Sequence, residues 1–449
     1  MRRDACALVL PLALAALLAL PASAAPAAPV LQQWTTSQGS HVLFIEEHAL
    51  PMIDVEIDFH AGSAYDPPGK EGLAALVIDN LNDGTPQHDE QALARAFADA
   101  GAQLAGQADA DRASLTLRTL SSAAQREPAL DLLCELLHAP TFPQPAFERE
   151  RTRSLSGLRE ALAQPDGLAD QAFYPRMFPG HGYGRQPGEA SLQAIARDDL
   201  ALFWSTRYRA AGAVISLVGD LDRTAAQALA ERLSAALPAG AAPDPLPPQS
   251  QPMVPGRIDI AHPAEQAHLL LGLPGFAFGD PDYVALMVAN YVLGGGGFSS
   301  RLTEEVREKR GLVYNVNSQF VPQAQPGAFE ISLQTRRDQA AQALALVRKV
   351  LDDFVAHGPT AAELKAAQQN LAGGFPLRLD SNRKLLAFAA MMGFYHLPDD
   401  WMQAYPRAIR TLTLAQVRDA VRRRLHPDQL LTVVVAGSPA ADAPAGAVQ

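Results

Sequence analysis

Cysteine is nearly absent from this chain: its 449 residues contain only two, Cys6 and Cys134. A single cysteine outside the N-terminal segment cannot build a disulfide framework, so burial of apolar side chains must stabilise the fold. Cys134 lies in the apolar helical pattern LDLLCELL. That pattern predicts a buried thiol rather than a reactive one.

Basic clusters are also missing. The formal net charge is −11, and no basic run or interleaving of basic and aromatic residues occurs, which argues against nucleic acid as a partner. No apolar run after Leu20 has the length of a membrane span. Histidine pairs at the spacing of a helical metal site are missing too. The stretch HPAEQAH, residues 262–268, has Gln266 where a second ligand would be needed.

The N-terminal residues follow the order of a secretory signal. Arg2 and Arg3 precede an apolar run over residues 5–20, which ends at the small residues Ala22-Ser23-Ala24. This order predicts a cleaved signal peptide over residues 1–24, with an uncleaved anchor as the alternative. Because the signal lacks a lipid-attachment pattern, we expect a periplasmic protein with no membrane attachment after cleavage; export to the outside stays open.

A stretch rich in proline, alanine and glycine divides the remaining chain. Residues 236–256, ALPAGAAPDPLPPQSQPMVPG, show almost no hydrophobic periodicity and predict an extended linker. On either side, the sequence predicts an N-terminal domain over 25–235 and a C-terminal domain over 257–440. Residues 441–449 are expected to form a flexible tail.

The two predicted domains repeat one order of elements. The segments that begin at Ala113 and Phe329 each contain an alternating strand that ends in a threonine (Thr119, Thr335), then an apolar helix, a turn with proline and a charged helix. In the second copy, Thr360 and Glu363 have the spacing of a capping box. The sequence therefore predicts an α+β fold of two homologous domains. Each is expected to be a largely antiparallel sheet with helices packed on one face, and together they would form a clamp.

Three stretches resemble the pitrilysin/insulinase family of zinc metallopeptidases, in its short two-domain bacterial form. They are FHAGSAYDPPGKEGLAALVIDNLNDGT in the first half, FPGHGYGRQPGEASLQAIARDDLALFWSTRYRAAGAVISLVGDLD near its end, and GGGGFSSRLTEEVREKRGLVYNV in the second half. The resemblance implies a helix in the first stretch that carries His-x-x-Glu-His in active members. There, two histidines bind zinc and the glutamate is the general base.

The chain departs from that pattern at every one of these positions. Ala75, Ile78 and Asp79 stand where the resemblance places the histidine, the glutamate and the second histidine, and Gly157 stands at or next to the third ligand. Ala105-Gly106 replaces the Asn-Ala that precedes the family's substrate-binding edge strand, so peptide pairing in this half is also in doubt. We expect no zinc and no catalytic residue in this chain.

The second half retains its family motif. Arg307 and Tyr314 match the arginine and tyrosine that bind the substrate backbone and stabilise the oxyanion in active members. The resemblance therefore implies the non-catalytic subunit of a heteromeric zinc peptidase. Arg307 and Tyr314 would act on a peptide in the zinc site of a homologous partner that carries His-x-x-Glu-His. The alternatives are a peptide-binding or scaffold protein with no proteolytic role, and an active peptidase with a relocated site.

Overall fold

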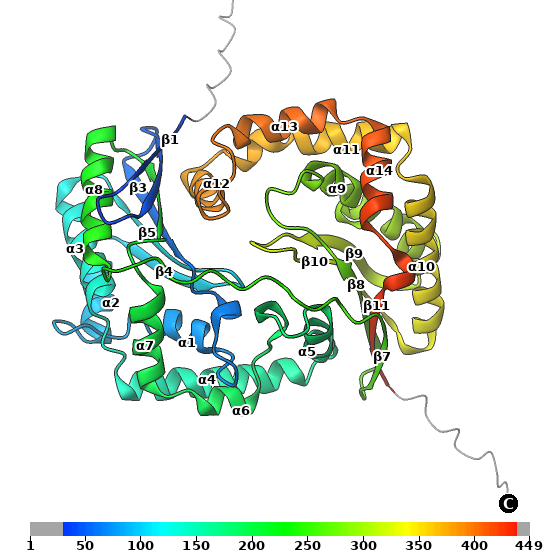
Figure 1. Ribbon diagram of the computed structural model, residues 1–449, viewed down its shortest axis with the longest axis horizontal. Helices are drawn as coiled ribbons and strands as arrows, with labels where there is room; N and C mark the ends of the chain where they lie inside the picture. The colour runs from blue at the N-terminus through cyan, green and yellow to red at the C-terminus, as the bar shows by residue number, and fades with distance from the viewer. Residues whose placement is uncertain (1–29, 438–449) are drawn as a thin grey trace, which may run out of the picture. The chain divides into compact units, whose positions relative to one another are not determined.

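Two β-sheets organise the chain (Figure 1). The computed structural model describes residues 30–437, so the predicted signal peptide, Cys6 and the predicted tail from 441 lie outside the described residues. The first sheet has the order β1-β2-β6-β3-β5-β4 and the second has the order β7-β11-β8-β10-β9. The strands of the first sheet are β1 (Leu31–Thr35), β2 (His41–Glu46), β3 (Met52–Phe59), β4 (Gln103–Ala108), β5 (Ala113–Leu120) and β6 (Val214–Gly219). Those of the second are β7 (Gly256–Ala261), β8 (Gln266–Pro274), β9 (Val313–Val321), β10 (Ala328–Arg336) and β11 (Leu431–Ala436).

The two sheets share one topology. If β1 is set aside, β2-β6-β3-β5-β4 corresponds strand by strand to β7-β11-β8-β10-β9. In each sheet the first pair, β2 with β6 and β7 with β11, is parallel, and every other pair is antiparallel. The predicted α+β fold of two homologous, largely antiparallel sheets is confirmed.

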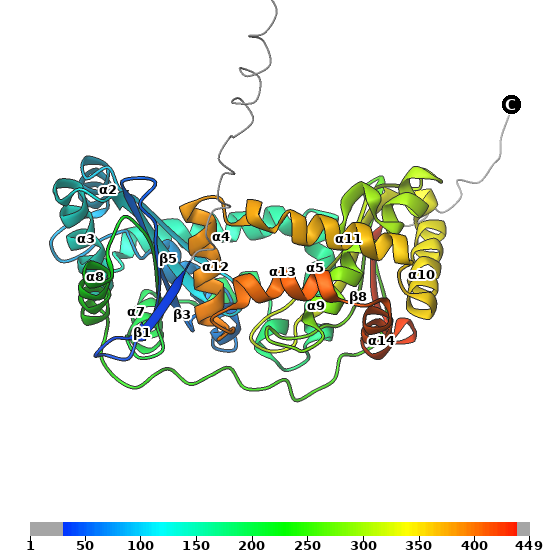
Figure 2. The ribbon, with the colours of Figure 1, turned by 90° about the horizontal axis from the view of Figure 1, so that it is seen from above.

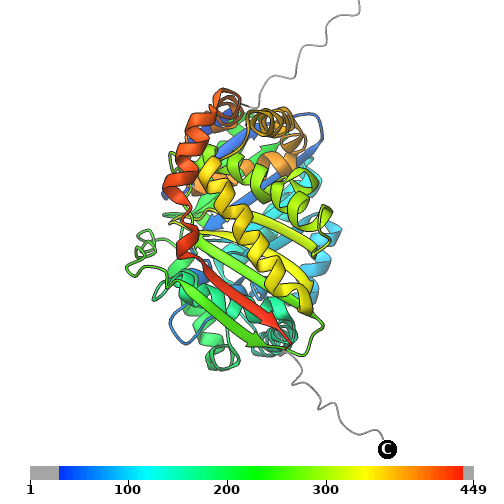
Figure 3. The same ribbon diagram turned by 90° about the vertical axis from the view of Figure 1, so that its right-hand side faces the viewer.

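One face of each sheet is covered by helices of its own half. The α-helices of the first half are α1 (Leu73–Asp79), α2 (Glu90–Asp99), α3 (Ala123–His138), α4 (Gln144–Leu162), α5 (Pro165–Met177), α6 (Glu189–Ala194), α7 (Arg197–Arg207) and α8 (Arg223–Ala236). Those of the second half are α9 (Tyr283–Asn290), α10 (Ala340–His357), α11 (Ala361–Gly373), α12 (Asn382–Phe394), α13 (Trp401–Thr411) and α14 (Leu414–Arg424). Figure 3 shows α10, in yellow, lying across the second sheet.

The repeated segments fold alike. Strands β5 and β10 are each followed by a long helix, α3 or α10, whose apolar residues are buried against the sheet. The next helix is α4 in the first half and α11 in the second. Thr360 caps α11 by accepting a hydrogen bond from the backbone N–H of Glu363, and the carboxylate of Glu363 accepts one from the backbone N–H of Thr360. The predicted capping box is confirmed.

Two helices cross over to the opposite sheet (Figure 1), which the sequence did not predict. Helix α5 of the first half packs Phe173 and Met177 against Val433 of β11, and α12 of the second half packs Leu386 and Met392 against the first sheet. Each exchange buries the sheet face that α3 or α10 leaves open. Burial stabilises the fold by about 1.5–3 kcal/mol for each large apolar side chain.

The segment between α8 and β7 contains no regular secondary structure, and Figure 2 shows it as an extended loop, in green. Its backbone is held by the second half: the side-chain amide of Gln325 donates to the carbonyl oxygens of Leu246 and Pro247 at 2.7 and 2.8 Å.

Cys134 is a free, half-buried thiol on α3, and burial raises its pKa. Among residues 30–437, no helix combines the length and apolar character of a membrane span.

Asp111, in the turn between β4 and β5, joins the two halves. Its carboxylate accepts hydrogen bonds from the hydroxyl of Tyr183 and, in the second half, from the backbone N–H of Ala324 at 2.9 Å and the hydroxyl of Tyr395 at 3.0 Å. Only 3% of Asp111 is exposed. A buried carboxylate is costly unless donors satisfy it, so these donors hold the two halves at this point.

We expect Asp111→Asn to lower the free energy of unfolding by about 2 kcal/mol or more, because an amide presents an N–H group to donors that need an acceptor. Tyr395→Phe removes one donor and should cost about 1 kcal/mol. Urea denaturation measures both changes. Equal stability of Asp111→Asn and the unmodified protein would show that Asp111 does not hold the halves together.

Two carboxyl groups are neighbours on the buried face of β3 that lies opposite its apolar side chains. One nitrogen of the Arg112 guanidinium lies 3.2 Å from Asp58 and 3.8 Å from Glu56, and the Ser114 hydroxyl donates to Asp58 at 2.5 Å. The positive charge of Arg112 therefore stabilises the ionised form of Asp58 more strongly than that of Glu56. Burial, followed by the charge of Asp58, raises the pKa of Glu56.

Because the pKa of Glu56 is raised, the folded protein near neutral pH keeps a proton on this carboxyl group that the unfolded chain has released. The contribution of Glu56 to the free energy of unfolding is thus full below its ordinary pKa of about 4.3 and falls as the pH rises through neutrality. We expect Glu56→Gln, which mimics the protonated form, to flatten this fall. Denaturation at several pH values should show it, with the exposed Glu148→Gln as the control. Parallel pH profiles for Glu56→Gln and the unmodified protein would contradict the assignment.

Candidate functional site

Helix α1 keeps the backbone of a metal-site helix. Gly72 precedes it with φ 103°, a left-handed conformation that favours glycine. The carboxylate of Asp66 accepts hydrogen bonds from the N–H groups of Gly72 and Ala74 at 2.7 and 2.8 Å, which satisfies the start of the helix. The local fold is therefore retained although the ligand positions have changed.

The side chains on α1 cannot hold zinc. Ala75 and Asp79 lie one turn apart on its exposed face, at the spacing of a ligand pair, and Ile78 is buried. Alanine and isoleucine have no atom that binds a metal. Within residues 30–437, no group of three or more His, Cys, Asp or Glu side chains is arranged to hold a metal ion.

Helix α4 supplies a positive charge near Asp79. Burial raises the pKa of Asp79, and the charge of Arg153 opposes that rise while the charge of Glu150 adds to it. Arg153 is itself ion-paired with Glu150 at 2.7 Å. Gly157, the predicted third-ligand position, lies on the same helix with open space around it. Arg153 could not be singled out from the sequence, in which its signal is a positive charge four residues before Gly157.

Ile78 and Gly106 pack together, so two departures from the family pattern meet in space. A Cβ atom at Gly106 on β4 would lie 2.7 Å from Cγ1 of Ile78, closer than such atoms approach one another. Glycine on the edge strand therefore makes room for the isoleucine that stands at the glutamate position. The position that the resemblance assigns to the glutamate is therefore part of the apolar core, in which Ile78 is 5% exposed.

Arg307 and Tyr314 come together in the second half. Arg307 lies on the π-helical turn η5 (Thr303–Glu308) and Tyr314 on the edge strand β9, so the seven-residue spacing does not correspond to two turns of one helix. The carbon of the Arg307 guanidinium is 6.0 Å from the centre of the Tyr314 ring. A register shift between β9 and β10 leaves Tyr314 without an opposite residue, and 78% of it is exposed. This bulge turns the tyrosine out of the core.

Phe298 is a third member of this group that sequence reasoning missed. Its ring centre lies 5.1 Å from the guanidinium carbon of Arg307, and 74% of the residue is exposed. Phe298 belongs to the glycine-rich stretch LGGGGFSS, which folds into a π-helical turn η3 (Tyr291–Gly295) and a 3-10 turn η4 (Gly297–Ser299). The sequence signal was an aromatic residue among glycines. Phe298 and Arg307 line a pocket of about 420 Å³ beside β9, together with Asn317 and Gln319. We call it the Arg307 pocket.

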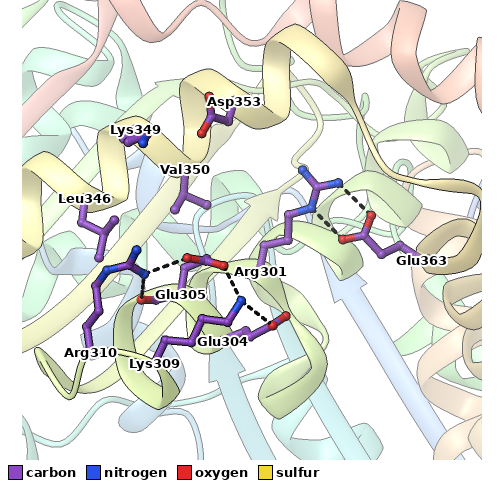
Figure 4. A pocket seen from close by; sticks show the side chains of 10 residues that line it. All are labelled: Arg301, Glu304, Glu305, Lys309, Arg310, Leu346, Lys349, Val350, Asp353 and Glu363. Carbon is purple, nitrogen blue, oxygen red and sulfur yellow. Dashed lines mark hydrogen bonds and ion pairs between the residues drawn. The ribbon is translucent and has the colours of Figure 1, made fainter.

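A second pocket, of about 380 Å³ and lined by residues of η5, α10 and the start of α11, is shown in Figure 4. Most of its charged side chains form ion pairs. Arg301 donates hydrogen bonds to both carboxylate oxygens of Glu363 at 2.6 and 2.7 Å. The carboxylate of Glu305 forms ion pairs with Lys309 and Arg310. The pair with Arg301, just before η5, anchors this segment to α11. The pocket therefore supports the segment that carries Arg307.

The contact between Ile78 and Gly106 predicts energetic coupling. Gly106→Ala should cost about 1–2 kcal/mol of stability in the unmodified protein, because the added methyl group overlaps Ile78. The same change in Ile78→Ala should cost clearly less, because the cavity accepts the methyl group. A double-mutant cycle in urea measures the difference. Gly157→Ala, on an open helical surface, is the control and should stabilise slightly. Additive effects within about 0.3 kcal/mol would contradict the contact.

Comparison with known proteins agrees with this geometry. Residues 41–186 match the family described as insulinase (peptidase family M16), and residues 194–371 match the peptidase M16 inactive domain. A crystal structure of a peptidase M16 inactive domain from Pseudomonas fluorescens is 37% identical, with a TM-score of 0.87 over 91% of this chain and 98% of that one.

More distant relatives span similar lengths. The Helicobacter pylori protein named non-peptidase homolog YmxG is 28% identical over 88% of this chain and 91% of its own length. A crystal structure described as a protease from Helicobacter pylori is 20% identical, with a TM-score of 0.82 over 91% of this chain and 100% of that one, and shows the shared fold. The chain therefore belongs to peptidase family M16.

Proposed function

We propose that this protein is the non-catalytic subunit of a heteromeric zinc metallopeptidase. The observation that carries the proposal is an asymmetry between the two halves. In the first half, the positions of a zinc site hold Ala75 and Ile78, and Ile78 packs into the core. In the second half, Arg307 and Tyr314 converge on an exposed edge. If the whole protein had simply lost its function, nothing would have preserved the arrangement of Arg307 and Tyr314 in the second half.

The chemistry of the second site suits a role in binding and oxyanion stabilisation. A guanidinium has several N–H donors and a permanent charge, and a phenol hydroxyl is a further donor. Both can donate to the carbonyl oxygen of a peptide and to the negative charge that develops there during attack by water. The rings of Phe298 and Tyr314 both lie within cation–π distance of the guanidinium.

The proposal requires a partner. It would be a homologous chain that carries His-x-x-Glu-His and holds the zinc, while the subunit described above completes the cavity around a peptide substrate. Both chains would be exported to the periplasm, this one through the predicted signal at residues 1–24. The inactive-domain match over residues 194–371 and the similarity to a non-peptidase homologue support a chain without its own activity.

A peptide-binding or scaffold protein with no proteolytic role is the second candidate. It is favoured by the printed name of the Helicobacter pylori relative, a non-peptidase homologue. Purification of the tagged protein from its own host separates the two candidates. A stoichiometric partner with His-x-x-Glu-His, together with peptide cleavage that a chelator abolishes, is expected. A protein that purifies alone and without activity would favour the scaffold.

In the assembled complex, Arg307→Ala combined with Tyr314→Phe should lower peptide cleavage by about 10²-fold or more, as for other lost oxyanion donors. The measurement is kcat/KM for a quenched fluorescent peptide, with co-purification of the partner as evidence that the complex still forms. Arg257→Ala, which removes an arginine at the opposite edge of the same sheet, is the control. Unchanged turnover in the double variant would end the proposal that these residues support catalysis.

A further inference from the structure

Three histidines gather where α12 of the second half packs on the first sheet. His41 begins β2, His60 directly follows β3, and His396 lies just beyond the end of α12. In the first sheet, β6 lies between β2 and β3, and its Val214 is paired with His41 on one side and with Asp58 on the other. His41 and His60 therefore lie at the same end of the sheet, on either side of β6.

Both side chains belong to the face of the sheet that α12 covers. Leu43, two residues after His41, packs against α12, and side chains two apart on a strand share a face. The ring centre of His60 lies 4.5 Å from that of Phe394, the last residue of α12. A Cβ atom at Gly393 would lie 2.2 Å from Cδ1 of Leu43. The end of α12 is thus in close contact with the sheet beside both histidines.

His60 is kept neutral by its surroundings. Burial, followed by the charges of His396 and Arg207, lowers the pKa of His60 to about 4. Both of these neighbours are positive when protonated, so neither would stabilise a second imidazolium. Protonation of His60 would thus introduce an opposed charge at the contact with the Phe394 ring.

His41 has surroundings of the same kind. Burial, followed by the charge of His396, lowers its pKa, and the charge of Asp399 opposes that shift. The carboxylate of Asp399 accepts a hydrogen bond from the side-chain amide of Gln33 at 2.9 Å. His396 itself is exposed and has a φ of 50° in the turn after α12. It therefore acts on the histidines of both strands.

Other carboxyl groups on this face of the first sheet already have partners. The charged and titratable groups beside the end of α12 are Glu56, Asp58, Asp109, Asp111, Arg112 and Arg207. The guanidinium of Arg112 is shared among Glu56, Asp58 and Asp109, at 3.8, 3.2 and 3.3 Å. Asp111 accepts from its three donors. A proton on one of the histidines gains a carboxylate partner here only if one of these contacts breaks.

We propose that acid releases the end of α12 from the first sheet, and that His41, His60 and His396 are the groups that respond to it. Imidazolium charges on the two sides of the contact would repel one another. The hydroxyl of Tyr395, next to Phe394, would then leave Asp111, so the second half would lose its hold on the first at this point. At neutral pH, His41 and His60 are neutral and α12 stays in place.

The direction of the pH dependence follows from His60. Because its pKa is lowered in the folded protein, the contact with α12 has its full strength above the ordinary histidine pKa of about 6.5 and weakens as the pH falls toward 4. At pH 5.0, recovery of the ordinary pKa on release would favour the released form about 30-fold through His60 alone.

The test is amide hydrogen exchange, followed by mass spectrometry, on the full chain purified without a partner. Rates at pH 7.5 and pH 5.0 are each divided by the rate of an unfolded peptide at the same pH. Peptides from α12 should lose protection about 10-fold or more at pH 5.0. Peptides from α8, which packs on the other face of the first sheet and contains no histidine, should change less than about twofold.

His41→Gln, His60→Phe and His396→Asn together remove the three protonation sites. Phenylalanine keeps a ring against Phe394, and asparagine tolerates the left-handed backbone at position 396. In this triple variant, the acid-induced loss of protection in α12 should shrink to within about twofold.

The control is His357→Gln combined with His426→Gln. Both histidines are exposed, at the end of α10 and after α14, and this variant should keep the full acid effect on α12. His396→Asn alone changes an exposed position and should reduce the effect about threefold or more, which keeps the test available if the triple variant does not fold.

Four results would overturn the proposal: equal protection of α12 at the two pH values, a loss that survives in the triple variant, no reduction in His396→Asn, or an equal loss in α8, which would indicate general unfolding by acid. The assay contains neither partner nor peptide. Its outcome is therefore independent of the cleavage experiment on Arg307 and Tyr314.

Discussion

The carboxylate of Asp111 is the point on which the relation between the two halves depends. It is buried in the turn of the first sheet's β4–β5 hairpin, yet two of its three hydrogen-bond donors belong to the second half. A charge in such a place is tolerated only while all its donors are present. Any movement that separates the β9–β10 loop or the end of α12 from the first sheet would leave that charge unsatisfied.

The two halves have the same topology and opposite surface chemistry. In the first half, Asp58 and Asp54 on the sheet face are paired with Arg112 and Arg118, and Ile78, at the position that the resemblance assigns to the glutamate, lies in the core. In the second half, the aromatic and basic residues at the edge of β9 remain exposed, and Glu330 has no basic partner in its pocket. The strand order is duplicated, so these differences come from side chains and from local changes of backbone such as the bulge between β9 and β10.

Much of this could be read from the sequence. Alternating and helical periodicity identified the strands and helices of the repeat, and Thr360 with Glu363 marked a helix start, because these signals are local. The family resemblance placed Ala75, Ile78 and Asp79 by the Gly-Leu-Ala before them and the Gly-Thr after them. The sequence could not show that Gly106 packs on Ile78, that a bulge turns Tyr314 outward, or that Arg153 lies near Asp79. Each depends on pairing or packing between residues far apart in the chain.

The exchange of α5 and α12 has a consequence for how the chain can be divided. Phe173 and Met177 cover the second sheet although they precede the linker, and Leu386 and Met392 cover the first although they follow it. Neither half encloses its own apolar surface, so a break at residues 237–255 would not release two independent domains. The two fragments would remain associated through surfaces as apolar as a protein interior, and either fragment made alone would expose an aggregation-prone face. Covalent continuity through the linker is thus less important to the integrity of the molecule than the reciprocal burial of these two helices.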